Sequence, residues 1–227
     1  MAGRRLGSRE PVGVRSFGTA DGLILLLALR WTLLLGVIAF IGGGVGGAVV
    51  ALARVGRPRW LRILAAVYIK VLQGLPLLIL LFLVFFGLNI LGIAVNAWTA
   101  AAIGYTLYGS AFLGDIWRGC IEAVPAGQWD AATALGLRPA ARLRLVIAPQ
   151  ALRIAVAPSV GFLVQLLKST SLASVIGFTE LTQAAQMVNN VTFQPLAVFG
   201  TAAGLYFLLC YPLSLWSTRL EARLRRG

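Results

Sequence analysis

The sequence predicts an all-α integral membrane protein with about five transmembrane helices, on the basis of its composition and the grouping of its apolar residues. Hydrophobic residues make up 59% of the 227 residues, charged residues only 12%, and the mean hydropathy is +0.87. A soluble domain carries about 25% charged residues because its surface faces water, whereas lipid solvates an apolar exterior. In lipid the backbone must satisfy its hydrogen bonds within the chain, which favours helices.

Five apolar runs define the predicted spans, since about 20 helical residues cross the hydrocarbon core. The first two runs are longer than this, which indicates tilted helices. The fourth run is the least apolar because it contains Arg153, Pro158 and Gln165. We expect a single membrane domain at 22–224, preceded by an N-terminal segment at 1–21. The predicted spans are residues 23–52, 61–88, 97–117, 151–167 and 196–216.

The placement of arginine orients the predicted helices, because loops on the cytoplasmic side are enriched in Lys and Arg. Arginines are concentrated in the gap at 53–62, in the gap at 118–153 and in the tail, whereas the gaps at 89–96 and 168–195 contain one cation, Lys168. Five spans therefore put the C-terminus in the cytoplasm and the N-terminus outside. Four arginines of the N-terminal segment oppose the second placement, namely Arg4, Arg5, Arg9 and Arg15.

The residue inventory disfavours several other function classes. The net charge is +13, but the basic residues occupy the gaps between spans rather than one face with exposed aromatic residues, so we expect no nucleic-acid partner. The chain has no His, and Cys120 and Cys210 lack the spacing of metal ligands, so we expect no metal site. A GxGxxG pattern at 42–47 lies inside an apolar run with no strand before it. Gly43 and Gly47 of that pattern indicate close helix packing instead.

A basic, Ala-rich loop at 125–149 joins the third and fourth predicted spans. Residues 128–135 can form about two helical turns. Gly136 is typical of a helix end, and Pro139 is typical of a helix start. We expect the prolines of this region to divide it into short helical pieces. These prolines are Pro125, Pro139, Pro149 and Pro158.

The short helix predicted inside this loop has the features of a docking element. Asp130 lies in its first turn, where the helix dipole favours a carboxylate. Ala131, Ala132 and Leu135 form a small apolar face. Such a helix, held between two spans, suits a groove on a partner protein. The alternative is an amphipathic loop that lies on the membrane surface.

The loop resembles the signature loop of permease subunits of bacterial ABC importers of the polar amino acid (histidine, glutamine and arginine) class. That family has Glu-Ala-Ala, then a Gly four residues after the second Ala, and later Pro-Gln-Ala-Leu-Arg. The matching residues are Asp130-Ala131-Ala132, Gly136 and Pro149-Gln150-Ala151-Leu152-Arg153, with Asp130 in place of Glu and Ala148 in place of the usual Leu. The resemblance covers about residues 22–224 and implies a type I ABC importer permease-like fold with a cytoplasmic coupling helix. The residues that it assigns to the ATPase contact are Gln128, Asp130, Ala131, Ala132, Leu135, Gly136 and Pro149.

Polar residues in or beside the spans are candidates for the translocation path or its gate. The runs at 73–76, 115–119 and 167–172 resemble runs of the same family. A structural alternative stands beside each: a kinked helix for the first run, an ion pair for the second, and a snorkelling lysine for the third. Glu180 is the nearest acidic candidate to pair with Lys168. The candidate residues are Gln73, Asp115, Arg118, Gln165, Lys168, Thr170, Ser171 and Glu180.

The resemblance implies a membrane subunit that binds no cofactor and catalyses no reaction. In that family ATP and Mg²⁺ bind to an ABC ATP-binding subunit, present in two copies. The expected partners also include a second permease subunit, identical or paralogous, an extracytoplasmic solute-binding protein, and the lipid of a bacterial inner membrane. Three alternatives stay open: an ABC importer of another small polar solute, a secondary transporter that needs no ATPase, and an intramembrane hydrolase built on Ser110, for which the chain supplies no histidine base.

Overall fold

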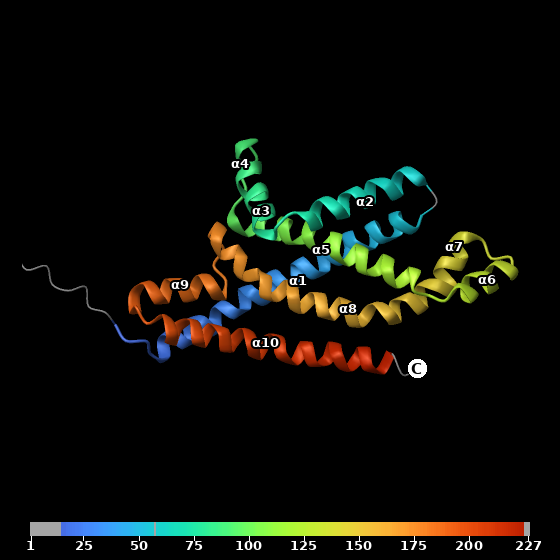
Figure 1. Cartoon of the computed structure of the whole chain (residues 1–227). Coiled ribbons are helices and arrows are strands. Elements are labelled where there is room, and N and C mark those ends of the chain that lie inside the picture. The colour runs from blue at the N-terminus through green and yellow to red at the C-terminus, as the bar shows by residue number, and fades with distance from the viewer. Residues whose placement is uncertain (1–14, 57, 225–227) are drawn as a thin grey trace, which may run out of the picture.

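The structure, a computed structural model, describes residues 15–56 and 58–224, and every regular element in this part of the chain is a helix (Figure 1). The predicted all-helical fold class is therefore confirmed. The α-helices are α1 (Thr19–Val55), α2 (Arg59–Gly74), α3 (Leu77–Phe82), α4 (Leu88–Ile90), α5 (Ala97–Glu122), α6 (Ala126–Ala134), α7 (Pro139–Arg142), α8 (Ala148–Ser169), α9 (Leu181–Thr192) and α10 (Pro195–Leu224). The wider π-helical segments η1 (Leu83–Gly87) and η2 (Leu143–Ile147) and the 3₁₀ segment η3 (Thr170–Ile176) connect some of them.

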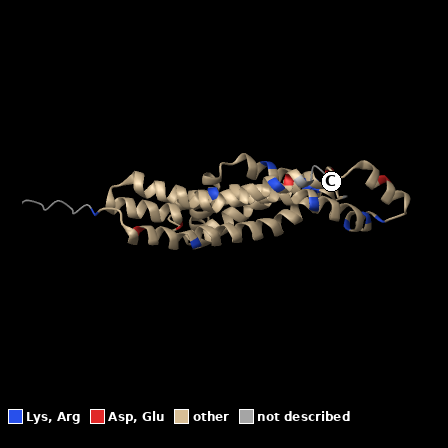
Figure 2. Cartoon of the chain, turned by 90° about the horizontal axis from the view of Figure 1, so that it is seen from below, with Lys and Arg blue, Asp and Glu red and all other residues tan. Residues whose placement is uncertain are grey.

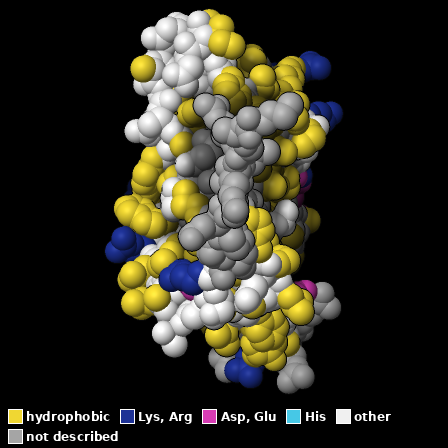
Figure 3. All heavy atoms as spheres, turned by 90° about the vertical axis from the view of Figure 1, so that its left-hand side faces the viewer, with side chains coloured by type: hydrophobic (Ala, Val, Ile, Leu, Met, Phe, Trp, Pro, Cys, Tyr) yellow, Lys and Arg dark blue, Asp and Glu magenta, His cyan; other side chains and the backbone are white. Residues whose placement is uncertain are grey.

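The long helices α1, α5, α8 and α10 run along one common direction, with α6 and α7 beyond one end of the bundle and α9 near the other (Figure 1). Lys and Arg gather toward the end that carries α6, α7 and the C-terminus (Figure 2). Seen from the opposite end, hydrophobic side chains cover much of the visible surface (Figure 3). Three of the four N-terminal arginines that oppose an outside N-terminus, Arg4, Arg5 and Arg9, lie outside the described residues. The fourth, Arg15, forms an ion pair with the buried carboxylate of Asp21.

Four of the five predicted spans satisfy both length and hydropathy. In the described chain, three helical stretches are long and apolar enough to cross a membrane, Thr19–Val55, Pro139–Ile176 and Pro195–Ala222, and a bent helix pair makes a fourth. The fourth predicted span, the weakest in the sequence, lies within Pro139–Ile176. Helix α5, with 26 residues, is about 39 Å long, which also suffices for crossing. Its Gly, Thr, Ser and Tyr residues lower its hydropathy. Such residues are tolerated in α5 because this helix packs against other helices of the chain.

The contact between α1 and α5 is built on glycine. A Cβ placed on Gly43 would lie 2.9 Å from both the carbonyl carbon and the Cα of Gly109. A Cβ on Gly47 would lie 2.9 Å from the Cβ of Leu113. The two backbones therefore touch directly, as small residues permit between membrane helices. The close helix packing predicted for the glycine run at 42–47 is confirmed.

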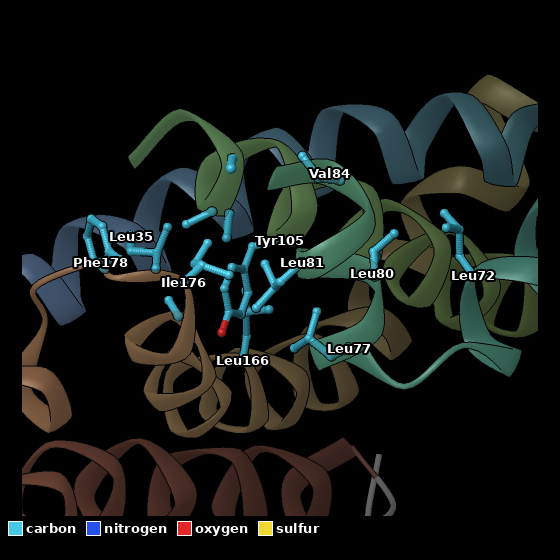
Figure 4. Packing of buried hydrophobic residues seen from close by; sticks show 14 of the residues in the cluster. Leu35, Leu72, Leu77, Leu80, Leu81, Val84, Tyr105, Leu166, Ile176 and Phe178 are labelled. Carbon is cyan, nitrogen blue, oxygen red and sulfur yellow. The ribbon is translucent and has the colours of Figure 1, made fainter. Parts of the chain in front are cut away.

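The main apolar core lies where α1, α3, α5, α8 and η3 meet, and Figure 4 shows it from close by. Tyr105 of α5 is fully buried among Leu35, Leu81 and Leu166. Its hydroxyl donates a hydrogen bond to the backbone carbonyl of Ser169 at the end of α8. A buried tyrosine needs such a partner. This bond ties the end of α8 to α5.

The second predicted span breaks rather than kinks. Helices α2 and α3 meet at an angle of 104°. Helix α2 ends at Gly74, and Leu75 takes an extended backbone with φ −92° and ψ 133°. The residue before a proline is driven out of the helical region by the proline ring, so Pro76 explains the break. The predicted position was right, and the bend is larger than a kink.

The proline prediction was right for Pro125 and Pro139 and wrong for Pro149 and Pro158. Helix α8 runs without interruption from Ala148 to Ser169. Pro149 is the second residue of α8 and directly follows the wider π-helical segment η2, which continues into α8. Pro158 lies in the helix interior, and Ser217 of α10 donates a hydrogen bond of 2.9 Å to the neighbouring carbonyl of Ala157. Packing against α10 thus holds a helix that the proline would otherwise weaken.

Candidate functional site

The loop between α5 and α8 forms two short helices joined by a tight turn. Helix α6 ends at Ala134, and Gly136 has a left-handed backbone with φ +70°. The N–H groups of Gly136 and Leu137 donate to the carbonyls of Thr133 and Ala132 at 2.9 and 3.2 Å. These bonds satisfy carbonyls that the helix end leaves free. The helix end predicted at Gly136 and the helix start predicted at Pro139 are both confirmed.

The apolar face predicted for this helix is divided in the structure. Leu135 is 77% exposed, and Ala131 and Asp130 are also exposed. Ala132, in contrast, is 2% exposed, because α6 packs against η2. The prediction that Ala132 belongs to an outward docking face was therefore wrong, since its side chain packs inside the loop. Gln128 and Pro149 are exposed, as the docking prediction requires.

The side chains of Arg142 and Gln150 link α6 to the part of the loop that follows the turn. Arg142 donates from Nη1 to Oγ1 of Thr133 at 2.5 Å, and its guanidinium carbon lies 5.6 Å from the ring centroid of Trp129. Gln150 donates to the side-chain oxygen of Gln128 at 3.1 Å. The sequence indicated neither contact, because the partners are 9 to 22 residues apart and follow no helical spacing. The one indication in the sequence that this loop packs on itself was Trp129, a large aromatic residue in a polar segment.

The predicted pair of Asp115 and Arg118 is present at the end of α5. Arg118 donates to Asp115 at 2.9 Å and to Glu122 at 2.5 Å. The side chains of Asp115, Arg118 and Glu122 are 36%, 24% and 56% exposed, respectively, and all three belong to α5. Exposed pairs of this kind contribute about 0–1 kcal/mol. The geometry thus favours the structural interpretation of this pair over a gate.

A cavity of about 280 Å³ lies between the end of α8 and α10. Its polar groups are the Lys168 ammonium, the Ser171 hydroxyl, and the hydroxyls of Thr182 and Tyr206, which lie 3.2 Å apart. The sequence did not single out Thr182 and Tyr206 as path residues. Tyr206 is a polar aromatic residue in an apolar run, which was a weak signal. The cavity is lined by Lys168, Ser171, Thr182, Phe199, Ala202, Ala203 and Tyr206.

The expected partner of Lys168 is engaged elsewhere. Within the described residues no ion pair joins Lys168 to Glu180. Glu180 is fully buried and accepts a hydrogen bond of 2.6 Å from the hydroxyl of Tyr206. It also accepts one of 3.5 Å from Thr32 and caps α9 by accepting from the backbone N–H of Gln183 at 3.0 Å. Glu180 therefore joins α1, α9 and α10, and Lys168 is left facing the cavity.

The remaining path candidates do not all converge on this cavity. Gln165 is exposed and lies one turn before Lys168 on α8. Thr170 is fully buried, and its hydroxyl donates to the carbonyl of Leu167 at 2.7 Å, so it caps the helix end. Gln73 is exposed at the bend after α2, on another element. The structure thus brings together Lys168 and Ser171 and separates them from Gln73 and from the ion pair of α5.

Ser110, the candidate for a hydrolase nucleophile, sits in a structural contact. It is 4% exposed and its Oγ lies 2.5 Å from the hydroxyl of Tyr68. It also donates to the carbonyl of Leu107 at 2.8 Å. A serine nucleophile needs an adjacent base, and a tyrosine hydroxyl and a backbone carbonyl do not serve that role. The contact instead ties α2 to α5.

A bundle of apolar helices with a broken span, a cavity that holds an ammonium and hydroxyl groups, and a projecting helical loop fits a membrane transport subunit. The family model of the binding-protein-dependent transport system inner membrane component matches residues 43–226, and the chain belongs to this family. Its members are permease subunits of ABC transport systems, so this chain is an ABC permease subunit, in line with its resemblance to the polar amino acid class.

Curated relatives and solved structures resemble most of the chain. The probable amino-acid ABC transporter permease protein YckA of Bacillus subtilis (strain 168) is 34% identical over 199 residues, which cover 88% of this chain and 88% of that protein. The probable glutamine ABC transporter permease protein GlnP of the same organism is 39% identical over 165 residues, which cover 70% of this chain and 75% of that protein. The crystal structure of an amino acid ABC transporter with histidines has a TM-score of 0.85 at 30% identity and covers 92% of this chain and 100% of that chain. The type I ABC importer permease-like fold is confirmed, and the secondary-transporter alternative is not favoured.

Proposed function

We propose that this chain is the permease subunit of an ATP-driven importer of amino acids in the bacterial inner membrane. The names of the relatives support this substrate class. The gathering of Lys and Arg near α6, α7 and the C-terminus supports a cytoplasmic location for that end (Figure 2). The N-terminus then lies outside. ATP and Mg²⁺ belong to two copies of a separate ABC ATP-binding subunit, and a solute-binding protein delivers the amino acid from outside.

Helix α6 and the turn after it are the proposed contact with the ATPase subunit. They project beyond the bundle on the side richest in Lys and Arg (Figures 1 and 2). Leu135, the residue that follows α6, offers an exposed apolar group, and Asp130 in α6 offers an exposed carboxylate. An exposed apolar anchor of this kind suits a groove on a partner protein. The proposed contact residues are Gln128, Asp130, Ala131, Leu135, Gly136 and Pro149.

The cavity at Lys168 is the proposed part of the translocation path. Its α10 residues, Phe199 to Tyr206, lie 4 to 11 residues beyond the start of the apolar stretch Pro195–Ala222, or about 6 to 17 Å along it. Lys168 therefore lies within the depth of the membrane, where an unpaired ammonium is costly and marks a functional site by default. Every amino acid carries a carboxylate, and an ammonium that is in no ion pair among the described residues is a good partner for one. A second permease subunit and lipid cover the apolar outer faces, such as the exposed stripe of Ile41, Val45 and Val49 on α1.

The first test is co-purification. The chain is tagged at its C-terminus, extracted gently from its native membrane, and the proteins that accompany it are identified. We expect an ABC ATP-binding subunit to be recovered, with a second permease subunit. An unrelated multi-pass protein with the same tag is the control. Recovery of the chain alone would contradict the proposal and return the secondary transporter to consideration.

Lys168→Met is expected to lower amino acid uptake by about 10-fold or more, since a hydrogen bond to a charged group contributes about 1.5–3 kcal/mol. The measurement is uptake of radiolabelled L-glutamine into vesicles that contain the complete complex with its binding protein. Lys168→Arg keeps the charge and is expected to retain more activity. Lys70→Met removes the other lysine, which is exposed on α2 outside the cavity, and is expected to leave uptake within about two-fold. Equal losses for both methionine variants would contradict a special role for the cavity.

A further inference from the structure

Arg142 connects the two short helices, α6 and α7, in the loop between α5 and α8. It is the last residue of α7, and its side chain is only partly exposed. Its Nη1 donates to Thr133 Oγ1 at 2.5 Å, and its guanidinium carbon lies over the Trp129 ring, 5.6 Å from the ring centroid. Thr133 is fixed in turn, because its hydroxyl donates to the carbonyl of Trp129 at 2.8 Å. The oxygen lone pair of Thr133 therefore points toward Arg142.

A planar guanidinium suits this position better than an ammonium does. It can stack on the tryptophan ring with its face and donate to the threonine hydroxyl with its edge at the same time. The Nε of Arg142 is fully covered and has no partner among the described residues. An exposed arginine of the same segment, Arg144, has no such contacts in the described chain.

One hydrogen bond and an apolar cluster also join helix α6 to the start of α8. Gln150 of α8 donates to Gln128 of α6 at 3.1 Å, and it is positioned by a second bond of 2.9 Å to the carbonyl of Val146 in the preceding turn. An apolar cluster lies beneath, where Trp129 packs against Ile147 and its neighbours. Helix α6 is thus held at its beginning by Gln150, at its end by Arg142, and on one face by apolar packing. The turn at 135–138 is the one break between α6 and α8, because α7 and η2 lead directly into α8.

We propose that Arg142 is the positioning residue that makes α6 and α8 move as one rigid lever. This inference rests on the proposed function, because it assumes that α6 contacts the ATPase. Lys168 lies 20 residues beyond Ala148 on the continuous helix α8, or about 30 Å away. A displacement of α6 is therefore carried directly to the cavity at Lys168. Without Arg142, α6 can tilt on its apolar base, and ATP hydrolysis no longer moves α8 fully.

The test separates docking from coupling. The complete complex with its binding protein is reconstituted in vesicles, and three quantities are measured: the affinity for the ATPase subunit, the rate of ATP hydrolysis, and the L-glutamine transported per ATP. Arg142→Gln is expected to leave ATPase affinity within about two-fold and to lower glutamine transported per ATP by about five-fold. Arg144→Gln is the matched control and is expected to change neither. Arg142→Lys keeps the cation near Trp129 and is expected to recover part of the ratio.

A double-mutant cycle identifies the contact that is responsible. If Arg142 acts through Thr133, the variant that combines Arg142→Gln with Thr133→Val loses no more coupling than Arg142→Gln alone. If the double variant loses more glutamine transported per ATP than Arg142→Gln alone, Arg142 acts through another contact, and the assigned contact with Thr133 is overturned.

The relative motion of the two helices can also be observed directly. Spin labels are attached at Ala126→Cys and Arg153→Cys, two exposed positions on α6 and α8 outside the proposed ATPase contact, with the buried Cys120 and Cys210 replaced by alanine. Arg142→Gln is expected to broaden the distribution of distances between the labels. A wild-type chain that binds no ATPase would refute the proposed function itself. A complex that assembles but shows an unchanged transport ratio and an unchanged distance distribution in Arg142→Gln would overturn the lever and leave the docking proposal intact.

Discussion

Gly136→Trp is expected to release the ATPase subunit while the permease stays in the membrane. Gly136 has φ +70°, a conformation that costs a residue with a side chain about 1–2 kcal/mol. No atom lies within 4 Å of the position of an added Cβ, so an indole ring would project from the turn into the space next to the exposed Leu135. It would stand where the proposed ATPase groove closes on α6. We expect a loss of ATPase affinity of about 10-fold or more, measured by co-purification and by titration with the isolated ATPase subunit.

Gly136→Asn is the matched control for this experiment. Asparagine adopts the left-handed conformation more readily than other residues with a side chain, and its side chain is small. We therefore expect it to retain the ATPase with little loss. If both variants release the ATPase, the backbone of the turn is responsible rather than the bulk of the indole. Wild-type affinity in Gly136→Trp would mean that the ATPase does not contact this turn, and would contradict the docking proposal.

The elements that could be predicted from the sequence are those set by local backbone chemistry. Gly136 and Pro139 mark a helix end and a helix start because their effects act within one or two residues. The same holds for the break before Pro76, where the proline ring excludes helix from Leu75. The apolar runs predicted the spans because lipid demands them over a length of about 20 residues. Such signals need no knowledge of the rest of the fold.

Tertiary contacts account for what the sequence did not predict. Pro158 resembles a helix breaker, but α10 packs beside it and α8 continues. Ala132 belongs to the apolar stripe of its helix, yet that stripe faces η2 on one side and open space on the other. Glu180 is close to Lys168 in sequence, but Tyr206 and Thr32 bind its carboxylate. In each case the deciding partner is on another helical element, which no local pattern of residues identifies.

The signature motif alone did not indicate how the loop is held. Its residues predicted the docking surface, whereas the contact of Arg142 with Thr133 and Trp129 is formed only after α7 folds back on α6. The same limitation applies to the cavity. Lys168 stands out in the sequence as a charge at the end of an apolar run, while Thr182 and Tyr206 become its neighbours only when α9 and α10 pack against α8.

Gly43→Ala is expected to lower the stability of the permease by about 1–3 kcal/mol, which corresponds to a decrease of about 5 °C in melting temperature for a chain of this size. The added methyl group would lie 2.9 Å from two backbone atoms of Gly109, and backbone cannot rotate away as a side chain can. Helices α1 and α5 would have to separate. This would loosen the apolar core around Tyr105, to which both helices contribute. The measurement is a thermal shift of the purified chain in detergent, together with the fraction that stays monodisperse.

Gly22→Ala is the control in the same helix with the same chemical change. No atom lies within 4 Å of its added Cβ, so only the backbone effect remains. Alanine is a better helix former than glycine by up to about 1 kcal/mol, and we expect the melting temperature to stay constant or to rise. The two variants should therefore shift stability in opposite directions. A Gly43→Ala chain as stable as Gly22→Ala would contradict a direct backbone contact between α1 and α5, because that contact leaves no room for a methyl group.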